Sequence, residues 1–387
     1  AWRRRSHLVA CVSADRLDVL GLPLALGSVP AWRNPSSLLV EVTMLSLRLY
    51  VRILGAVLIR PVSSATIWQV GKLLGHVEIR EDLPTPREFY EEYVHNIGGP
   101  FRGFGKPALF KGAAVRMPAF QRWTDEYLRQ RHGRVIMDMV ETEKKETRTK
   151  LPRENLRLAE FLDLYNSSEI YSVAKMPKGL ADEVFLLPPM NCGGFDRRLA
   201  ETVLWMSSGG TKSVIHSDGQ QNWHCMVAGR KDFIFWHPES PVGTKKLGWV
   251  SNAEAEAEKD PALKDAYGAF AARVDVDNVD LDRFPGWRDI EWWNMTLGPG
   301  DCTFIPSAWY HYVQSPAKQR SISFHVWFFE EKGFDQKSCD DMEKDGVDLS
   351  DYRIRLSDCT WGYERGGKKS KLTKCRTKSR EGTTAEL

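Results

Sequence analysis

Three residues carry the side chains of a potential metal site: His216, Asp218 and, far downstream, His311. Two neutral imidazoles and one carboxylate suit iron(II), and three protein ligands leave coordination positions open for a keto acid and dioxygen. In a strand, residues two apart point to the same face, so His216 and Asp218 can bind one ion while Ser217 points away. A His-x-Asp tripeptide alone indicates little, because a histidine in a strand is usually a structural residue.

The segment that contains His311 strengthens this prediction. Gly300 and Asp301 predict a tight turn, residues 302–305 predict a short strand that ends at Pro306, and His311 follows the next corner. Residues 321–328 alternate small or polar with bulky apolar side chains, which is typical of a half-buried strand. We expect this strand to return beside the metal-bearing strand.

Lys231 follows His216 by fifteen residues, within a predicted strand, turn and strand over 226–236. Its ammonium group could bind the distal carboxylate of a keto-diacid. The alternative is an ordinary exposed turn lysine, which is the better interpretation of the position taken by itself. The metal residues are what favour the first interpretation.

Residues 216–231, together with 300–311, resemble the JmjC family of 2-oxoglutarate oxygenases, most of all its small hydroxylase branch. The similarity is dense over 205–236 and 296–330 and extends loosely back to about residue 83. It implies that His216, Asp218 and His311 bind Fe(II). It also implies that Lys231 holds the C5 carboxylate of 2-oxoglutarate.

The resemblance assigns further positions around the co-substrate. Ser213 matches a hydroxyl that helps hold the same carboxylate. Asn222 and His325 match positions where the family usually has asparagines near the metal, and His325 departs from that pattern. An imidazole can still donate one hydrogen bond, so we interpret it as a tolerable substitution. For Trp205 and Trp327 we favour core packing over a role in the site wall.

The expected fold is mainly β with surrounding helices: a double-stranded β-helix of the jelly-roll or cupin type with an N-terminal α/β extension. The implied reaction uses Fe(II), 2-oxoglutarate and O2 to hydroxylate a protein side chain, with succinate and CO2 as co-products. One alternative is a JmjC lysine demethylase, which releases formaldehyde. Others are an inactive cupin scaffold, which the histidine at 325 slightly favours, and a cupin oxygenase or isomerase with a three-histidine metal site. The complete triad and Lys231 argue against the last two.

Charge is distributed unevenly along the 387 residues, whose formal net charge is +3. Residues 1–64 and 366–387 each carry +5, so the rest of the chain carries about −7. A negative body argues against nucleic acid as the main partner, because phosphate binding needs a cationic face. We expect a protein or peptide substrate and no stable membrane span, and a homodimer remains open.

The seven cysteines form no Cys-x-x-Cys pair and no zinc-finger spacing. Appended zinc-binding reader modules, which multidomain chromatin demethylases commonly carry, are therefore not expected. The odd count neither requires nor forbids disulfides, and Cys339 with Cys359 is the pair that we would test.

The chain divides into predicted segments. Residues 1–43, before Met44, are interpreted as upstream sequence outside the native protein, and 44–65 as a targeting segment, for which we favour the secretory over the mitochondrial route. Residues 66–160 form the N-terminal extension and 161–335 the catalytic core with an insertion at 239–290. Residues 336–387 form a C-terminal segment with a basic tail that we expect to be disordered.

Local signals predict two further features. Thr85 to Glu88 has the pattern of a helix start with a capping box, and Phe89, Tyr90 and Tyr93 would form its buried face. Within the insertion, residues 253–259 and 262–272 are predicted helices and 275–282 are acidic. These acids would favour a basic substrate near the mouth of the site, although a solvated helical excursion is the better interpretation.

Overall fold

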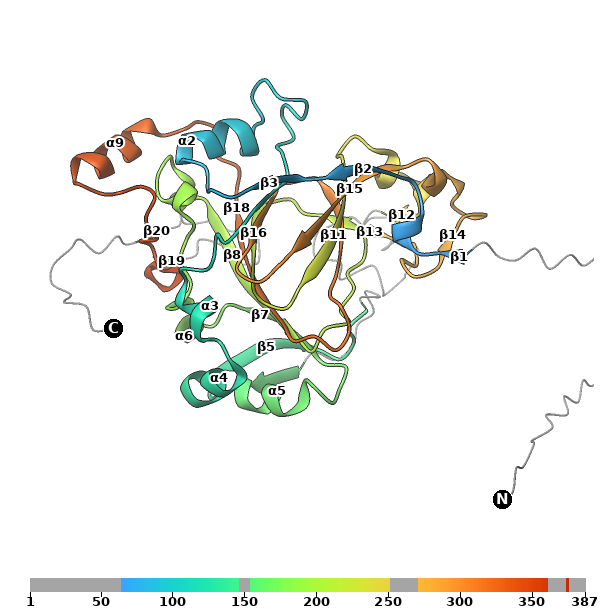
Figure 1. Cartoon of the computed structure of the whole chain (residues 1–387), viewed down its shortest axis with the longest axis horizontal. Coiled ribbons are helices and arrows are strands. Elements are labelled where there is room, and N and C mark those ends of the chain that lie inside the picture. Colours follow the sequence, from blue (N-terminus) through green and yellow to red (C-terminus); the bar gives the residue numbers. More distant parts are fainter. Residues whose placement is uncertain (1–63, 146–153, 251–270, 361–373, 376–387) are drawn as a thin grey trace, which may run out of the picture. The chain divides into compact units, whose positions relative to one another are not determined.

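Two β-sheets contain most of the strands in the computed structural model, which describes residues 64–145, 154–250, 271–360 and 374–375 (Figure 1). Within these residues the first sheet has nine strands, in the order β3 (Glu78–Arg80), β4 (Ala108–Phe110), β16 (Cys302–Ile305), β10 (Gln221–Ala228), β18 (Ser321–Phe328), β8 (Leu199–Ser207), β7 (Tyr171–Lys175), β5 (Ile136–Glu141) and β6 (Glu154–Arg157).

The second sheet has seven strands within the same described ranges, in the order β12 (Trp249–Val250), β13 (Ala271–Ala272), β9 (His216–Ser217), β17 (Tyr310–Gln314), β11 (Lys231–Trp236), β15 (Glu291–Leu297) and β2 (Lys72–His76). Two short pairs lie outside both sheets: β1 (Ser64–Ala65) with β14 (Val279–Asp280), and β19 (Cys359–Thr360) with β20 (Lys374–Cys375).

The chain crosses repeatedly between the two sheets. Strands β16, β10, β18 and β8 are neighbours in the first sheet, whereas β9, β17, β11 and β15 are neighbours in the second. All of these pairs are antiparallel. Such alternation along the chain produces the double-stranded β-helix of jelly rolls. The predicted fold class is therefore confirmed.

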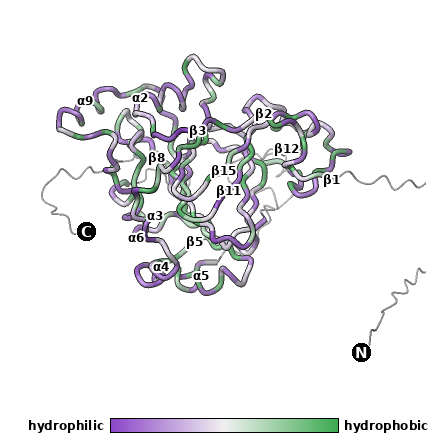
Figure 2. Tube along the Cα trace, viewed as in Figure 1, coloured by the Kyte–Doolittle hydropathy of each residue, from purple (hydrophilic) through white to green (hydrophobic). Residues whose placement is uncertain are grey.

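Helices are short and lie on the outside of the sheets. They are α2 (Pro86–Glu88), the π-helical turn η2 (Phe89–Val94), α3 (Pro118–Arg122), α4 (Asp125–His132), α5 (Leu158–Leu164), α6 (Lys178–Ala181) and α9 (Gln336–Lys344). The 3-10 turns are η1 (Ile67–Gln69), η3 (Pro188–Met190), η4 (Phe195–Arg197), η5 (Pro241–Gly243), η6 (Lys245–Leu247), η7 (Pro285–Arg288) and η8 (Leu356–Asp358). Figure 1 shows α4 and α5 beside β5, and Figure 2 shows that hydrophilic residues predominate along α9. No helix in the described ranges has both the length and the apolar character that a bilayer crossing requires.

The predicted capping box at the start of α2 is confirmed. The backbone N–H of Glu88 donates to the Thr85 hydroxyl at 3.1 Å, and the Thr85 N–H donates to the Glu88 carboxylate at 3.3 Å. The helix continues into η2, where Phe89 and Tyr93 are fully buried and Tyr90 is half-buried. Strands of the predicted extension join the barrel directly, since β4 pairs with β16 and β2 with β15.

Alternation along β10 separates the two faces of the first sheet. Trp223, Cys225 and Val227 belong to the apolar cluster beneath the helices. Met226 belongs to a different cluster, with Phe233 of β11, and therefore points between the sheets. Asn222 and His224 share the side of Met226, because residues two apart in a strand share a face.

Several sequence predictions about connections were wrong. Residues 321–328 do form a strand, but β18 pairs with β10 and β8 rather than with the strand of His216. Both sheets need half-buried strands, so the alternating pattern does not choose between them. Ala271 and Ala272, predicted as the end of a helix, form β13 because they pair with β9 and β12. Ser64 and Ala65, predicted as the end of a targeting segment, form β1, and the targeting segment itself stays a prediction.

The predicted Cys339–Cys359 pair is also wrong. The disulfides are Cys192–Cys339, Cys225–Cys302 and Cys359–Cys375. Two of the pairs join segments that only the fold brings together, and in all three the Cα atoms are 4.0 to 5.1 Å apart, below the roughly 7 Å beyond which a disulfide cannot form. Cys11, residues 1–63, the predicted helix 253–259 and the basic tail except residues 374–375 lie outside the described residues.

Candidate metal and co-substrate site

The structure brings His216, Asp218 and His311 together. One ligand atom from each lies within 4.8 Å of the others. The Nε2 atoms of both histidines are 3.9 Å from the Asp218 carboxylate, and the two ring centroids are 4.3 Å apart. Backbone pairing explains this placement, because His216 of β9 lies directly opposite His311 of β17.

Each histidine is oriented by a backbone carbonyl. The Nδ1–H of His216 donates to the oxygen of Val214 at 2.9 Å, and the Nδ1–H of His311 donates to the oxygen of Trp309 at 3.0 Å. A carbonyl only accepts, so the proton lies on Nδ1 and the lone pair of each neutral ring lies on Nε2. Both lone pairs are therefore on the atoms that face Asp218, which is the arrangement that a bound metal requires.

Asp218 follows the end of β9 and is held by the turn that precedes β17. The N–H of Ala308 donates to the backbone oxygen of Asp218 at 2.8 Å, and the N–H of Ser307 donates to the Gln221 side chain at 3.1 Å. Ala308 has a φ of +66°, a left-handed conformation that is uncommon for a residue with a Cβ. The turn thus connects the segment of the carboxylate to the strand of His311.

Lys231 is buried, so the interpretation as an exposed turn lysine was wrong. It is 4% exposed and is the first residue of β11. Its Nζ lies 5.3 Å from the ring centroid of Trp205, which belongs to the opposite sheet. The lysine therefore points into the interior between the sheets.

The distance between Lys231 and the triad suits a short diacid. Phe235, four residues further along β11, lies directly opposite His311, which gives a separation of roughly 13 Å along the strand. A five-carbon diacid and the lysine side chain together can fill that distance. Ser213 precedes β9 and lies beside β17, where its Oγ accepts from the N–H of Val313 at 2.9 Å. Its hydroxyl proton remains available for an anion.

Asn222 and His325 meet on the facing sheet, as a shared site requires. The side-chain amide of Asn222 donates to Nδ1 of His325 at 3.0 Å, and the two residues are 0% and 8% exposed. His325 then carries its proton on Nε2. Burial, together with the nearby cationic Lys231, holds the pKa of His325 well below its usual range, so the ring is neutral.

The sequence analysis missed His224. It is 1% exposed, lies opposite His325 in the β10–β18 ladder, and has its ring centroid 3.8 Å from that of His325. Burial, with contributions from His325 and Lys231, holds the pKa of His224 well below its usual range. The available signal was its spacing of two residues from Asn222, which places both on one face of the strand.

Trp205 and Trp327 pack against a small interior cluster of Tyr171, Val173 and Val203. The predicted core-packing role is consistent with these contacts. Both indole N–H groups are nevertheless buried without a hydrogen-bond partner among the described residues. Other interior atoms share this state: Asn222 Oδ1, both ring nitrogens of His224, His325 Nε2 and Ser323 Oγ.

Apart from Asn222 Oδ1, which can only accept, these buried atoms fit an acceptor-rich ligand. An indole N–H can only donate and each neutral imidazole provides one donor, whereas a dicarboxylate provides only acceptors. Buried donors without partners destabilise a protein unless a ligand or water satisfies them. The donor set of two imidazoles and one carboxylate likewise fits iron(II).

The insertion reaches the site through one strand. Ala271 of β13 lies opposite His216, so residues 271–272 flank the metal-bearing strand. Two of the predicted substrate-recruiting acids have other partners: Lys145 lies 2.6 Å from Asp275 and 2.9 Å from Asp277. Lys212 also lies 2.5 Å from Asp277, so two lysines balance these two carboxylates, and the pair does not provide the acidic surface that the sequence suggested.

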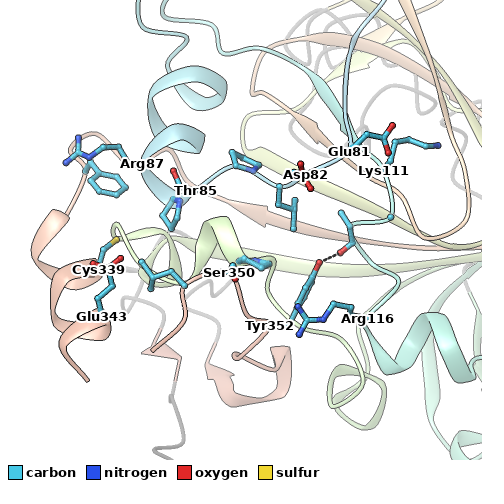
Figure 3. A pocket seen from close by; sticks show the side chains of 18 of the residues that line it. Glu81, Asp82, Thr85, Arg87, Lys111, Arg116, Cys339, Glu343, Ser350 and Tyr352 are labelled. Atoms are coloured by element: carbon cyan, nitrogen blue, oxygen red, sulfur yellow. Dashed lines mark hydrogen bonds between the residues drawn. The ribbon is translucent and has the colours of Figure 1, made fainter. Parts of the chain in front are cut away.

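A separate pocket of about 520 Å³ lies between α2 and the C-terminal segment (Figure 3). Thr85, Arg87, Cys339 and Glu343 contribute to its wall, and the Tyr352 hydroxyl in it donates to the oxygen of Ala113 at 2.7 Å. None of its lining residues belongs to the triad or to the predicted co-substrate positions.

Comparisons with known proteins agree with this geometry. Residues 100–334, more than half of the chain, match the family described as Cupin-like domain. Jumonji C domain-containing protein 5 of Drosophila melanogaster is 31% identical over 120 residues, which are 31% of this chain and 26% of that protein. Lysine-specific demethylase 8 of Danio rerio is 29% identical over 230 residues, 57% of this chain and 52% of that protein.

Bifunctional peptidase and (3S)-lysyl hydroxylase JMJD7 of Homo sapiens is 23% identical over 268 residues, which are 63% of this chain and 81% of that protein. The chain thus spans about half or less of the length of the first two relatives and most of the third.

Proposed function

Because the chain belongs to the cupin-like domain family and is related to JmjC proteins, we propose that it is an Fe(II)- and 2-oxoglutarate-dependent hydroxylase of protein side chains. The observation that carries this proposal is the combination of the triad with a buried cation in one barrel. His216, Asp218 and His311 converge within 4.8 Å, and Lys231 is 4% exposed between the same two sheets. A binding scaffold has no need of either feature.

Each residue has a defined task in this proposal. His216, Asp218 and His311 would hold the metal, while Lys231 and Ser213 would bind the C5 carboxylate of 2-oxoglutarate. Asn222 and His325 would orient the co-substrate from the facing sheet. The apolar side chains between the sheets would exclude water.

Iron(II), when bound, would supply the activation of dioxygen that couples decarboxylation of 2-oxoglutarate to insertion of oxygen into a C–H bond. The balance is one 2-oxoglutarate, one O2 and one C–H group consumed, and one succinate, one CO2 and one C–OH group formed. The role of the chain is to fix the distance between the metal and the lysine, which the ladder of β9, β17 and β11 sets.

The test is succinate formation by protein that is reconstituted with iron(II) under anaerobic conditions and then exposed to air. We expect iron-dependent turnover in the natural chain and its loss in His311→Ala and Asp218→Ala. His76→Ala is the matched control, because His76 is exposed on the edge strand β2. Turnover that survives both ligand substitutions, or no turnover by folded protein with bound iron, would contradict the proposal.

A protein substrate is supported by the relatives. The human protein that this chain covers to 81% has lysyl hydroxylase in its name, and the zebrafish relative is named a lysine-specific demethylase. The two outcomes differ in product. The chain is incubated with unmodified and with methylated lysine peptides. Hydroxylation would add one oxygen atom to a peptide without release of formaldehyde, whereas formaldehyde from the methylated peptide would indicate demethylation.

A further inference from the structure

His224 is the one buried imidazole in the interior, among the described residues, with no hydrogen bond to either ring nitrogen. His216, His311 and His325 each have at least one nitrogen bonded to a carbonyl or an amide. A buried imidazole without partners costs stability in the ligand-free protein, because its polar atoms have lost water and gained nothing. Such a residue calls for a ligand.

The surroundings of His224 indicate where that ligand lies. Its ring centroid is 3.8 Å from that of His325 and 5.5 Å from that of Phe233. Phe233 is one of the residues between Lys231 and Phe235, and Phe235 lies opposite His311. His224 therefore faces the middle of the path between the metal residues and the buried lysine.

We propose that His224 is a further co-substrate-binding residue, which donates a hydrogen bond from its neutral ring to the keto acid held between the triad and Lys231. With His325 Nε2 it provides two imidazole N–H donors on the face opposite the lysine. This inference rests on the proposed function. It adds a residue that the family resemblance did not assign.

Charge favours this arrangement. Burial and the neighbouring Lys231 and His311 keep the pKa of His224 low, so it stays neutral and retains one donor and one acceptor. A dicarboxylate would meet one full positive charge at Lys231 and neutral donors from the other sheet. The combination holds an anion without placing two cations side by side in the interior.

The test compares two substitutions of nearly equal shape. His224→Leu removes both polar atoms, whereas His224→Asn retains a donor and an acceptor. Binding of 2-oxoglutarate to the Mn(II)-loaded protein is measured by titration calorimetry, together with Mn(II) affinity and the melting temperature of the metal-free protein. A hydrogen bond to a charged carboxylate contributes more to binding than one between neutral groups. We therefore expect 2-oxoglutarate affinity to fall roughly tenfold or more in His224→Leu and less in His224→Asn.

A second readout separates binding from structure. If His224 serves the ligand, His224→Leu removes unsatisfied buried atoms, so the metal-free protein should melt at the same or a higher temperature. Equal 2-oxoglutarate affinity in the natural chain and in His224→Leu would overturn the inference about His224 but not the proposed function. A lower melting temperature with weaker Mn(II) binding would also overturn it, in favour of a structural role. Absence of 2-oxoglutarate binding by the natural Mn(II)-loaded chain would reject the proposed function itself.

Discussion

Replacing Lys231 with methionine should weaken 2-oxoglutarate binding by about 150-fold and leave metal binding intact. The side chain is 4% exposed, so its pairing with a carboxylate would be shielded from water. Removal of one partner from a buried ion pair costs about 3 kcal/mol or more, because the other charge stays buried and unpaired, and about 1.4 kcal/mol corresponds to each factor of ten. Methionine retains most of the length and volume of the lysine.

Thermal stabilisation by the ligand provides the assay. At a concentration one hundred times its dissociation constant, 2-oxoglutarate should stabilise the natural Mn(II)-loaded protein by about 2.7 kcal/mol. At the same concentration the Lys231→Met variant should gain only about 0.3 kcal/mol. Lys175→Met is the control, since Lys175 lies on β7 with a side chain that is 64% exposed beside Glu201.

The reasoning would be refuted by an undiminished ligand-induced shift in Lys231→Met, since the buried cation would then have no part in binding. Loss of Mn(II) affinity in the variant would also contradict it. The triad is positioned by β9 and β17, and Lys231 is not required for that pairing. Measurement of Mn(II) affinity alongside the shift separates these outcomes.

Three further predictions concern stability. Peptide mapping without reduction should recover the pairs Cys192–Cys339, Cys225–Cys302 and Cys359–Cys375, and any other pairing would contradict the fold. Loss of the Cys192–Cys339 bridge, which spans 147 residues, should lower the free energy of unfolding by about 5 kcal/mol. His224 is neutral when folded and has an ordinary pKa near 6.5 when unfolded, so unfolding takes up a proton below that pH and stability rises with pH. Urea denaturation at several pH values between about 5 and 6 gives the free energy of unfolding as a function of pH. This free energy should rise less steeply in His224→Leu than in the natural chain, by roughly 1.3 kcal/mol per pH unit. An equal rise in both would mean that the folded ring is protonated. Glu183→Leu should lower the free energy of unfolding, measured by urea titration, by about 3 kcal/mol. The Trp123 indole, which donates to Glu183 at 2.7 Å, and the Tyr127 hydroxyl both lose their acceptor in this variant. A decrease below about 1 kcal/mol would show that water replaces the carboxylate.

Local sequence patterns were sufficient where one segment determines the outcome. The capping box at Thr85 and the strand 302–305 follow from neighbouring residues, and both were predicted with their observed positions. The triad was also accessible, because His216 and Asp218 are two residues apart. Metal binding by the triad and co-substrate binding by Lys231 stay predictions until they are measured.

Predictions failed where distant segments decide the outcome. The pattern of residues 321–328 does not specify a sheet, and the interior neighbours of His224 come from β11 and β18. The burial of Lys231 could not be predicted from its own position, because the sequence does not show that the turn before it passes between two sheets; only the metal residues favoured a binding role over an exposed turn lysine. Cysteine pairing likewise depends on the completed fold, which places Cys192 beside Cys339 across 147 residues.

The passage of the chain from β10 to β11 connects the two halves of the site. Gly229 has a φ of +80°, and a Cβ at this position would lie 2.2 Å from the backbone oxygen of Arg320. Only glycine fits such a turn without displacing the neighbouring backbone. The turn brings Lys231 inward only three residues after Ala228 ends β10, while the Cys225–Cys302 bridge links β10 to β16 on the face away from His224. The spacing between His224 and Lys231 therefore depends on the backbone of this turn. Gly229→Ala should weaken co-substrate binding, although residue 229 itself touches no ligand.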